Sequence, residues 1–164
     1  MKSIKFIAFF LIFAFLISCN NRNEQSESET TNNNSKKLSV FTIKNLSHIL
    51  KTSKNKIVIV NFWSTWCPEC RKEIPDFIQF YDEFKDNVTL IGLALDENED
   101  DVINFIKISK INYPIFLCSK SLAEHFMIQA IPVTYIFKNG KFLFSHLGAY
   151  SYSQLKSDIL ALLK

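Results

Sequence analysis

Glycine is scarce in this chain, with three residues among 164, and no G-x-G-x-x-G stretch occurs. That stretch forms the loop that holds the phosphates of dinucleotides, so we expect no organic cofactor. Basic residues are not gathered into a stripe with interleaved aromatic residues, and the formal net charge is only +3. These absences exclude nucleic acid as a predicted partner. The chain has no internal repeat, and its length suffices for one domain with a hydrophobic core.

The first 18 residues have the pattern of a secretory signal. Lys2 and Lys5 provide a positive start, and the apolar stretch at residues 6–17 is short for a membrane span. Residues 16–19, Leu-Ile-Ser-Cys, resemble a bacterial lipobox. This resemblance implies cleavage before Cys19 and lipidation of its thiol, whereas the alternatives are an uncleaved anchor or an ordinary signal with a stray cysteine. We expect a lipid-anchored protein of the cell envelope, on the periplasmic side.

Residues 19–37 form the second predicted segment. From residue 20 to residue 37 the chain holds only Asn, Glu, Ser, Thr, Gln, Arg and Lys, without an apolar residue. Such a segment cannot bury enough surface to fold, so we interpret it as a flexible tether that begins at the lipidated Cys19. The folded domain is then predicted to span residues 38–164.

A C-x-x-C motif, Cys67-Pro68-Glu69-Cys70, follows the apolar run at residues 57–62. The run predicts a buried strand, and the residues after the first cysteine have helical periodicity. The free N–H groups and partial positive charge of a helix start favour the thiolate of Cys67, the form that attacks disulfides. Cys70 lies one turn further and can resolve the mixed disulfide. A zinc site is the alternative, but no second C-x-x-C or close pair of histidines supplies the other ligands.

Strand and helix patterns alternate through the domain. We predict strands at residues 40–43, 57–62, 88–95, 115–117, 133–137 and 141–146. We predict helices at residues 45–52, 67–84, 100–109 and 122–127, and a last helix that ends at residue 163. Pro75 should kink the second helix, Asn139-Gly140 predicts a hairpin, and residues 151–154, Ser-Tyr-Ser-Gln, resemble a capping box. The early β-α-β alternation predicts a parallel sheet, to which the hairpin adds antiparallel strands.

A C-x-x-C after a strand, a helix containing Pro75 and the later Ile131-Pro132 together resemble the thioredoxin fold. Residues 61–75, N-F-W-S-T-W-C-P-E-C-R-K-E-I-P, are similar to the signature of the TlpA/ResA-like branch of tethered bacterial thiol–disulfide oxidoreductases. Asn61 stands where thioredoxins proper carry an Asp, which agrees with this branch. The resemblance covers residues 38–164. It implies an α/β, thioredoxin-like domain with a central mixed β-sheet flanked by helices.

The resemblance also implies roles for individual residues. Ile131-Pro132 matches the cis-proline loop of these folds, whose backbone docks client peptides and whose proline keeps metal away from the dithiol. The branch carries a partly buried acid near the dithiol, and we expect Glu97 to be this acid and to accept the proton of Cys70. The alternative is that Glu97 belongs to a solvated acidic cap at a helix start, together with its acidic neighbours.

Other residues near the motif are interpreted from their own chemistry. We expect Trp63 in the core and Trp66 at an exposed apolar lip, which shields the disulfide and binds clients together with Pro68. Glu69 places negative charge beside Cys67, which disfavours the thiolate and makes the dithiol less oxidising, unless Glu69 is merely solvated. Cys118 is predicted to be a buried, inert thiol. The other Lys and Glu residues are interpreted as surface, and we expect a monomer.

The leading functional prediction is an extracytoplasmic reductase of client disulfides that receives electrons from a membrane donor protein. Cytochrome c maturation is one process that members of this family serve. An oxidase or isomerase is the second hypothesis, because the sequence does not set the reduction potential. A thiol peroxidase lacks support, since the Pro-x-x-x-Thr-x-x-Cys motif of peroxiredoxins is absent. A tethered Cu(I) chaperone is the non-enzymatic alternative, but the wider cysteine spacing and the additional histidine of such proteins are absent as well.

Overall fold

The computed structural model of the chain describes residues 37–53 and 56–164. The predicted signal segment, Cys19 and nearly all of the predicted tether lie outside the described residues. The elements follow in the order β1 (Val40–Phe41), α1 (Ile43–Thr52), β2 (Ile57–Trp63), α2 (Pro68–Phe84), β3 (Val88–Ala94), α3 (Glu99–Ser109), β4 (Ile115–Cys118), α4 (Lys120–His125), β5 (Val133–Lys138), β6 (Lys141–Leu147) and α5 (Tyr152–Leu163). No helix within these ranges is long and apolar enough to cross a membrane.

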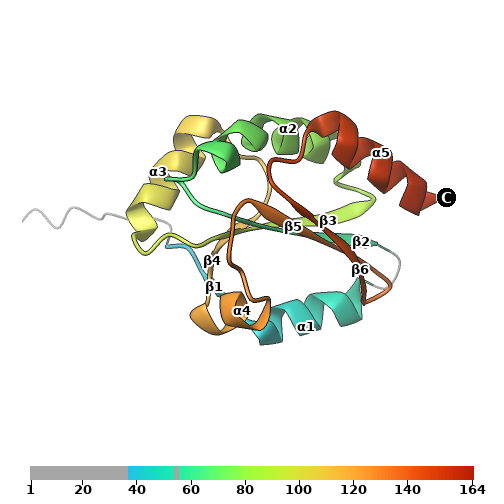
Figure 1. Cartoon of the computed structure of the whole chain (residues 1–164), viewed down its shortest axis with the longest axis horizontal. Helices are drawn as coiled ribbons and strands as arrows, with labels where there is room; N and C mark the ends of the chain where they lie inside the picture. The colour runs from blue at the N-terminus through green and yellow to red at the C-terminus, as the bar shows by residue number, and fades with distance from the viewer. Residues whose placement is uncertain (1–36, 54–55) are drawn as a thin grey trace, which may run out of the picture. The chain divides into compact units, whose positions relative to one another are not determined.

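A six-stranded mixed sheet, in the order β1-β4-β3-β2-β5-β6, forms the centre of the domain. The first four of these strands pair in parallel, whereas β5 pairs antiparallel with both β2 and β6. The predicted mixed sheet is therefore confirmed. Figure 1 shows α2, α3 and α5 on one side of the sheet and α1 and α4 on the other.

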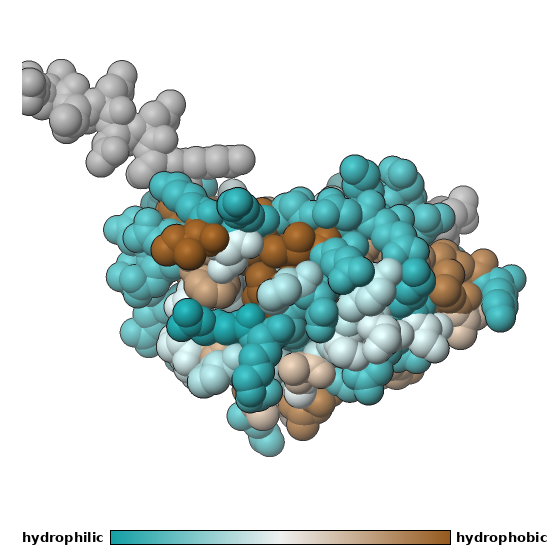
Figure 2. All heavy atoms as spheres, turned by 90° about the horizontal axis from the view of Figure 1, so that it is seen from above, coloured by the Kyte–Doolittle hydropathy of each residue, from teal (hydrophilic) through white to brown (hydrophobic). Residues whose placement is uncertain are grey.

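The central strand β2 supplies both hydrophobic cores, because successive side chains of a strand point to opposite faces. All seven of its residues are buried. Ile57 and Ile59 pack with α2 and α5 residues in one cluster, while Val58, Val60 and Phe62 belong to the cluster under α1. The outer face over α2, α3 and α5 is mainly hydrophilic, with separate apolar patches (Figure 2). The dithiol motif thus follows a strand that is held rigidly from both sides.

Local sequence signals explain several element ends. Asn139 and Gly140 both have positive φ angles, 54° and 74°, as the tight turn between β5 and β6 requires. The side chain of Ser151 accepts a hydrogen bond from the backbone N–H of Gln154, so Ser151 is the N-cap of α5 as predicted. The side chain of Gln154 accepts from the Ser151 hydroxyl at 2.9 Å, and not from the Ser151 backbone N–H as in a full capping box. The predicted strand 40–43 ends earlier, because Thr42 leaves it to become the N-cap of α1. Helix α2 continues past Pro75 to Phe84.

Candidate active site

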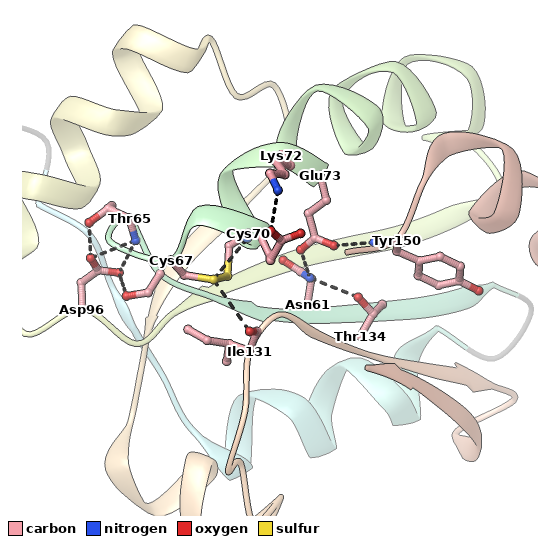
Figure 3. Close-up of a disulfide and its surroundings, with 12 residues drawn as sticks. Asn61, Thr65, Cys67, Cys70, Lys72, Glu73, Asp96, Ile131, Thr134 and Tyr150 are labelled. Atoms are coloured by element: carbon pink, nitrogen blue, oxygen red, sulfur yellow. Dashed lines mark hydrogen bonds and ion pairs between the residues drawn. A yellow bond between two sulfur atoms is a disulfide. The ribbon is translucent and has the colours of Figure 1, made fainter. Parts of the chain in front are cut away.

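The dithiol motif lies in the turn between β2 and α2, at the carboxyl end of the parallel strands (Figure 3). Cys67 is the N-cap residue of α2, and its Sγ accepts a hydrogen bond from the backbone N–H of Cys70 at 3.2 Å. Pro68 takes the first helical position, where a missing N–H is harmless. Cys67 and Cys70 form a disulfide. The start of α2 therefore places N–H donors around the sulfur that we predict to be the nucleophile.

The two cysteines differ in their access to solvent. Cys67 keeps 5% of its surface exposed and Cys70 keeps none, so Cys67 is the member of the pair that a client can reach. Trp66 is 67% exposed beside it, whereas Trp63 is fully buried and packs on Phe105 with 5.4 Å between ring centroids. The predicted burial of one tryptophan and exposure of the other are confirmed, and client contact by Trp66 stays a prediction.

The loop before β5 lies against the disulfide. The Ile131–Pro132 peptide bond is cis, as the resemblance implied. The carbonyl oxygen of Ile131 lies 3.8 Å from Sγ of Cys67, and the carbonyl oxygen of Pro132 accepts a hydrogen bond from the backbone N–H of Gly148 at 2.8 Å. Ile131 and Cys67 are 64 residues apart in the sequence, yet they lie side by side at Sγ of Cys67. The backbone of Ile131 can therefore contact a peptide that approaches this sulfur.

A buried carboxyl group lies one turn of α2 beyond Cys70. Glu73 is 1% exposed, and its two oxygens accept hydrogen bonds from Asn61 Nδ2 and from the backbone N–H of Tyr150, both at 2.9 Å. Asn61 also donates to Thr134 Oγ1 at 3.1 Å (Figure 3). Burial is the main cause that raises the pKa of Glu73 from 4.5 to about 7, and the two hydrogen bonds oppose this rise. The interpretation of this glutamate as a surface residue was wrong.

Glu97 does not have the burial that we expected. Its side chain is exposed in the segment between β3 and α3, so the prediction of a partly buried Glu97 is wrong. The preceding residue, Asp96, turns toward the motif instead and accepts hydrogen bonds from Ser64 and Thr65. Among the described acidic residues near Cys70, Glu73 is the one that combines burial with a pKa near neutrality.

Glu69 forms an exposed ion pair with Lys72, one helical turn away. Their Oε1 and Nζ atoms are 2.5 Å apart, and the two side chains are 56% and 67% exposed. Water and the lysine both screen the charge of Glu69, which weakens the predicted effect on Cys67. We expect Glu69→Gln to shift the reduction potential of the dithiol by less than about 10 mV, measured by equilibration with glutathione. A larger shift would restore Glu69 as a redox-tuning residue.

The third described cysteine is separate from this site. Cys118 ends β4 and is a half-buried free thiol. Burial raises its pKa to about 11, so it stays protonated at neutral pH and a poor nucleophile. This agrees with the predicted inert thiol, although its burial is only partial. Within residues 37–53 and 56–164, no group of three or more His, Cys, Asp or Glu side chains is placed to hold a metal ion.

Comparison with known proteins identifies the family. A profile described as the AhpC/TSA family matches residues 32–143. The chain belongs to the AhpC/TSA family. Within it, the peroxiredoxin motif is absent, while the C-x-x-C, the adjoining Ile131–Pro132 loop and the disulfide between Cys67 and Cys70 are present.

Similar proteins identify the class of enzyme within this family. The chain is 36% identical over 110 residues to sporulation thiol-disulfide oxidoreductase A of Bacillus subtilis, a match that covers 63% of the chain and 67% of the relative. It is 32% identical over 110 residues to thiol-disulfide oxidoreductase ResA of Bacillus cereus, covering 65% and 64% of the two chains. The predicted TlpA/ResA-like resemblance is confirmed, and this AhpC/TSA family member is a thiol–disulfide oxidoreductase.

Solved structures agree with this assignment. The crystal structure of StoA from Bacillus subtilis superposes with a TM-score of 0.58 at 32% identity, covering 64% of this chain and 83% of that one. A thiol:disulfide interchange protein of the thioredoxin family from Chlorobium tepidum superposes with a TM-score of 0.65 at 30% identity, covering 72% and 85%. The thioredoxin-like fold is therefore confirmed.

Proposed function

We propose that this protein is a membrane-tethered oxidoreductase of the cell envelope that reduces disulfides of client proteins. The observation that carries the proposal is the Cys67–Cys70 disulfide at the start of α2, with the Ile131 carbonyl 3.8 Å from the more accessible sulfur. The exposed Trp66 and Pro68 flank this sulfur, so a client segment can lie between them and the Ile131–Pro132 loop. The signal-like start and the lipobox-like residues support the location and the anchor.

The reaction proceeds through two thiol–disulfide exchanges. The Cys67 thiolate attacks one sulfur of the client disulfide, and the other client sulfur leaves as a thiolate and takes up a proton. Cys70 then loses its proton and attacks Sγ of Cys67, which breaks the mixed disulfide and releases the second client thiol. Two electrons and two protons have passed to the client, and the Cys67–Cys70 disulfide remains. A reduced membrane donor protein must then return two electrons.

Glu73 takes the proton-accepting role that the sequence had suggested for Glu97. Glu73 and Cys70 are both buried on α2 and lie three residues apart, so they share one face of the helix. A carboxyl group with a pKa of about 7 can accept a proton near neutral pH and later give it back. It supports the step in which Cys70 becomes a thiolate, because Cys70 is fully buried and Glu73 is a buried base on the same face of α2.

The reducing direction is supported by the acidic surroundings of the motif. A buried Glu73 that ionises near Cys70 disfavours a thiolate in the reduced pair, which destabilises the reduced state relative to the disulfide. Proteins whose reduced form is stabilised are oxidants, and the opposite holds for reductants. Reduction of haem-site cysteines during cytochrome c maturation is one process that such a reductase would serve.

The direct test is the reduction potential of the Cys67–Cys70 pair, measured in the full-length protein equilibrated with glutathione or dithiothreitol. We expect a value near that of thioredoxin, about −270 mV, or lower. A value near that of the periplasmic oxidant DsbA, about −120 mV, would instead identify a disulfide donor and contradict the proposed direction.

A further inference from the structure

Asp96 lies two residues after the end of β3, and its carboxylate accepts hydrogen bonds from several donors in the turn before Cys67. Its carboxylate accepts a hydrogen bond from Ser64 Oγ at 2.7 Å and from the backbone N–H of Thr65, which lies 3.1 Å from both oxygens. The hydroxyl of Thr65 donates to it as well (Figure 3). Three donors from two successive residues thus converge on one carboxylate that comes 31 residues later in the chain.

The residues that Asp96 holds begin the turn that carries the reactive sulfur. The backbone N–H of Cys67 donates to the carbonyl of Ser64 at 3.3 Å, which closes a four-residue turn with Thr65 and Trp66 at its centre. Ser64 is fully buried, whereas Trp66 is exposed. These hydrogen bonds to Asp96, which we call the Asp96 clamp, therefore fix the buried first half of the turn. The orientation of Trp66 and Cys67 in the second half depends on it. Disulfide exchange depends on such alignment, because a misplaced nucleophile loses its approach to the sulfur it attacks.

Asp96 also differs from Glu69 in how its charge is held. Glu69 pairs with Lys72 at the surface, whereas no described lysine or arginine forms an ion pair with Asp96. Its partners are neutral N–H and O–H groups of Ser64 and Thr65, which hold the negative charge at the turn that leads to Cys67. A fixed negative charge close to Cys67 disfavours its thiolate and thereby favours the disulfide over the dithiol.

We propose that Asp96 is a positioning residue of the dithiol: it fixes the turn that presents Trp66 and Cys67 to clients, and its charge makes the pair more reducing. The inference rests on the reducing function proposed above and extends it to a residue that touches neither sulfur nor client. The two effects are separable, because asparagine can keep hydrogen bonds to Ser64 and Thr65 while it removes the charge. Alanine removes both.

The test compares Asp96→Asn, Asp96→Ala and the control Glu69→Gln in the full-length protein in detergent micelles. Three quantities are measured: the equilibrium constant with glutathione, kcat/KM for insulin, and kcat/KM for a small aromatic disulfide. The small disulfide serves as a substrate that does not need contact with Trp66. We expect Asp96→Asn to shift the equilibrium about tenfold toward the dithiol, which is about 30 mV, and to keep the insulin rate. Asp96→Ala should show the same shift and an additional, roughly tenfold loss with insulin alone.

Each part of the proposal has an outcome that overturns it. If Asp96→Asn leaves the equilibrium where Glu69→Gln leaves it, the charge has no role. If Asp96→Ala reduces insulin at the wild-type rate, the positioning role is wrong. Should Asp96→Ala fail to fold, Thr65→Val removes one donor of the clamp and must lower the insulin rate without moving the equilibrium. A wild-type protein that does not reduce insulin contradicts the proposed function, while the glutathione equilibrium still reports on Asp96.

Discussion

A Cys70→Ser variant is expected to accumulate as a covalent adduct with its client. Cys67 is the accessible sulfur and opens the client disulfide, but the resolving thiol is absent, so the mixed disulfide persists. Turnover with insulin should fall by roughly a thousandfold or more, since the first exchange alone does not release the client from Cys67. The adduct is detected by non-reducing electrophoresis and mass spectrometry, as a species that dithiothreitol separates into its two chains.

The complementary variant distinguishes the two cysteines. Cys67→Ser should lose turnover to the same extent yet trap no client, because Cys70 is fully buried and cannot reach one. Cys118→Ser is the matched control: its thiol lies outside the disulfide and should leave turnover and trapping unchanged. Equal trapping by Cys67→Ser and Cys70→Ser would contradict the assignment of Cys67 as the nucleophile.

The features that the sequence predicted well are those encoded by neighbouring residues. The run at residues 57–62 is apolar except for Asn61, and it forms a strand buried on both faces. Asn139-Gly140 supplies two residues that tolerate positive φ, and the hairpin forms there. The C-x-x-C motif similarly combines strand, turn and helix start within a few residues. In each case the physical cause is local, so periodicity and turn chemistry suffice.

The buried acid near the dithiol was predicted at the wrong position because its environment is not local. Glu73 lies on the buried stripe of α2 with Cys70, Ile74 and Phe77, and a charged residue on such a stripe is a signal that could have identified it. Its partners stand 12 and 77 residues away, on β2 and before α5, and sequence spacing does not reveal their convergence. Glu97 follows its strand as expected, yet the chain turns its neighbour Asp96 inward instead.

Glu73 should make the stability of the oxidised protein fall as pH rises. Its pKa is about 7 in the folded protein against 4.5 for the ordinary group, so between these values the folded state binds more protons than the unfolded state. The free energy of unfolding contributed by this group is therefore full below about pH 4.5 and is lost as pH rises through 7. The pKa difference corresponds to a loss of about 3 kcal/mol, which is a large part of the stability of a typical domain.

Urea unfolding of the oxidised wild-type protein and of Glu73→Gln, at pH 5 and at pH 8, measures this loss. Glutamine cannot ionise, so the decrease between the two pH values should be about 2 to 3 kcal/mol smaller in the variant. Its absolute stability at pH 5 should be lower than wild type, because its NH₂ group faces one of the donors of Asn61 and Tyr150 and leaves that donor without an acceptor. Glu97→Gln removes an exposed carboxylate and should keep the wild-type decrease. Parallel pH dependences for wild type and Glu73→Gln would show that Glu73 does not titrate near neutrality, and the proton-accepting role would then have no base at this position.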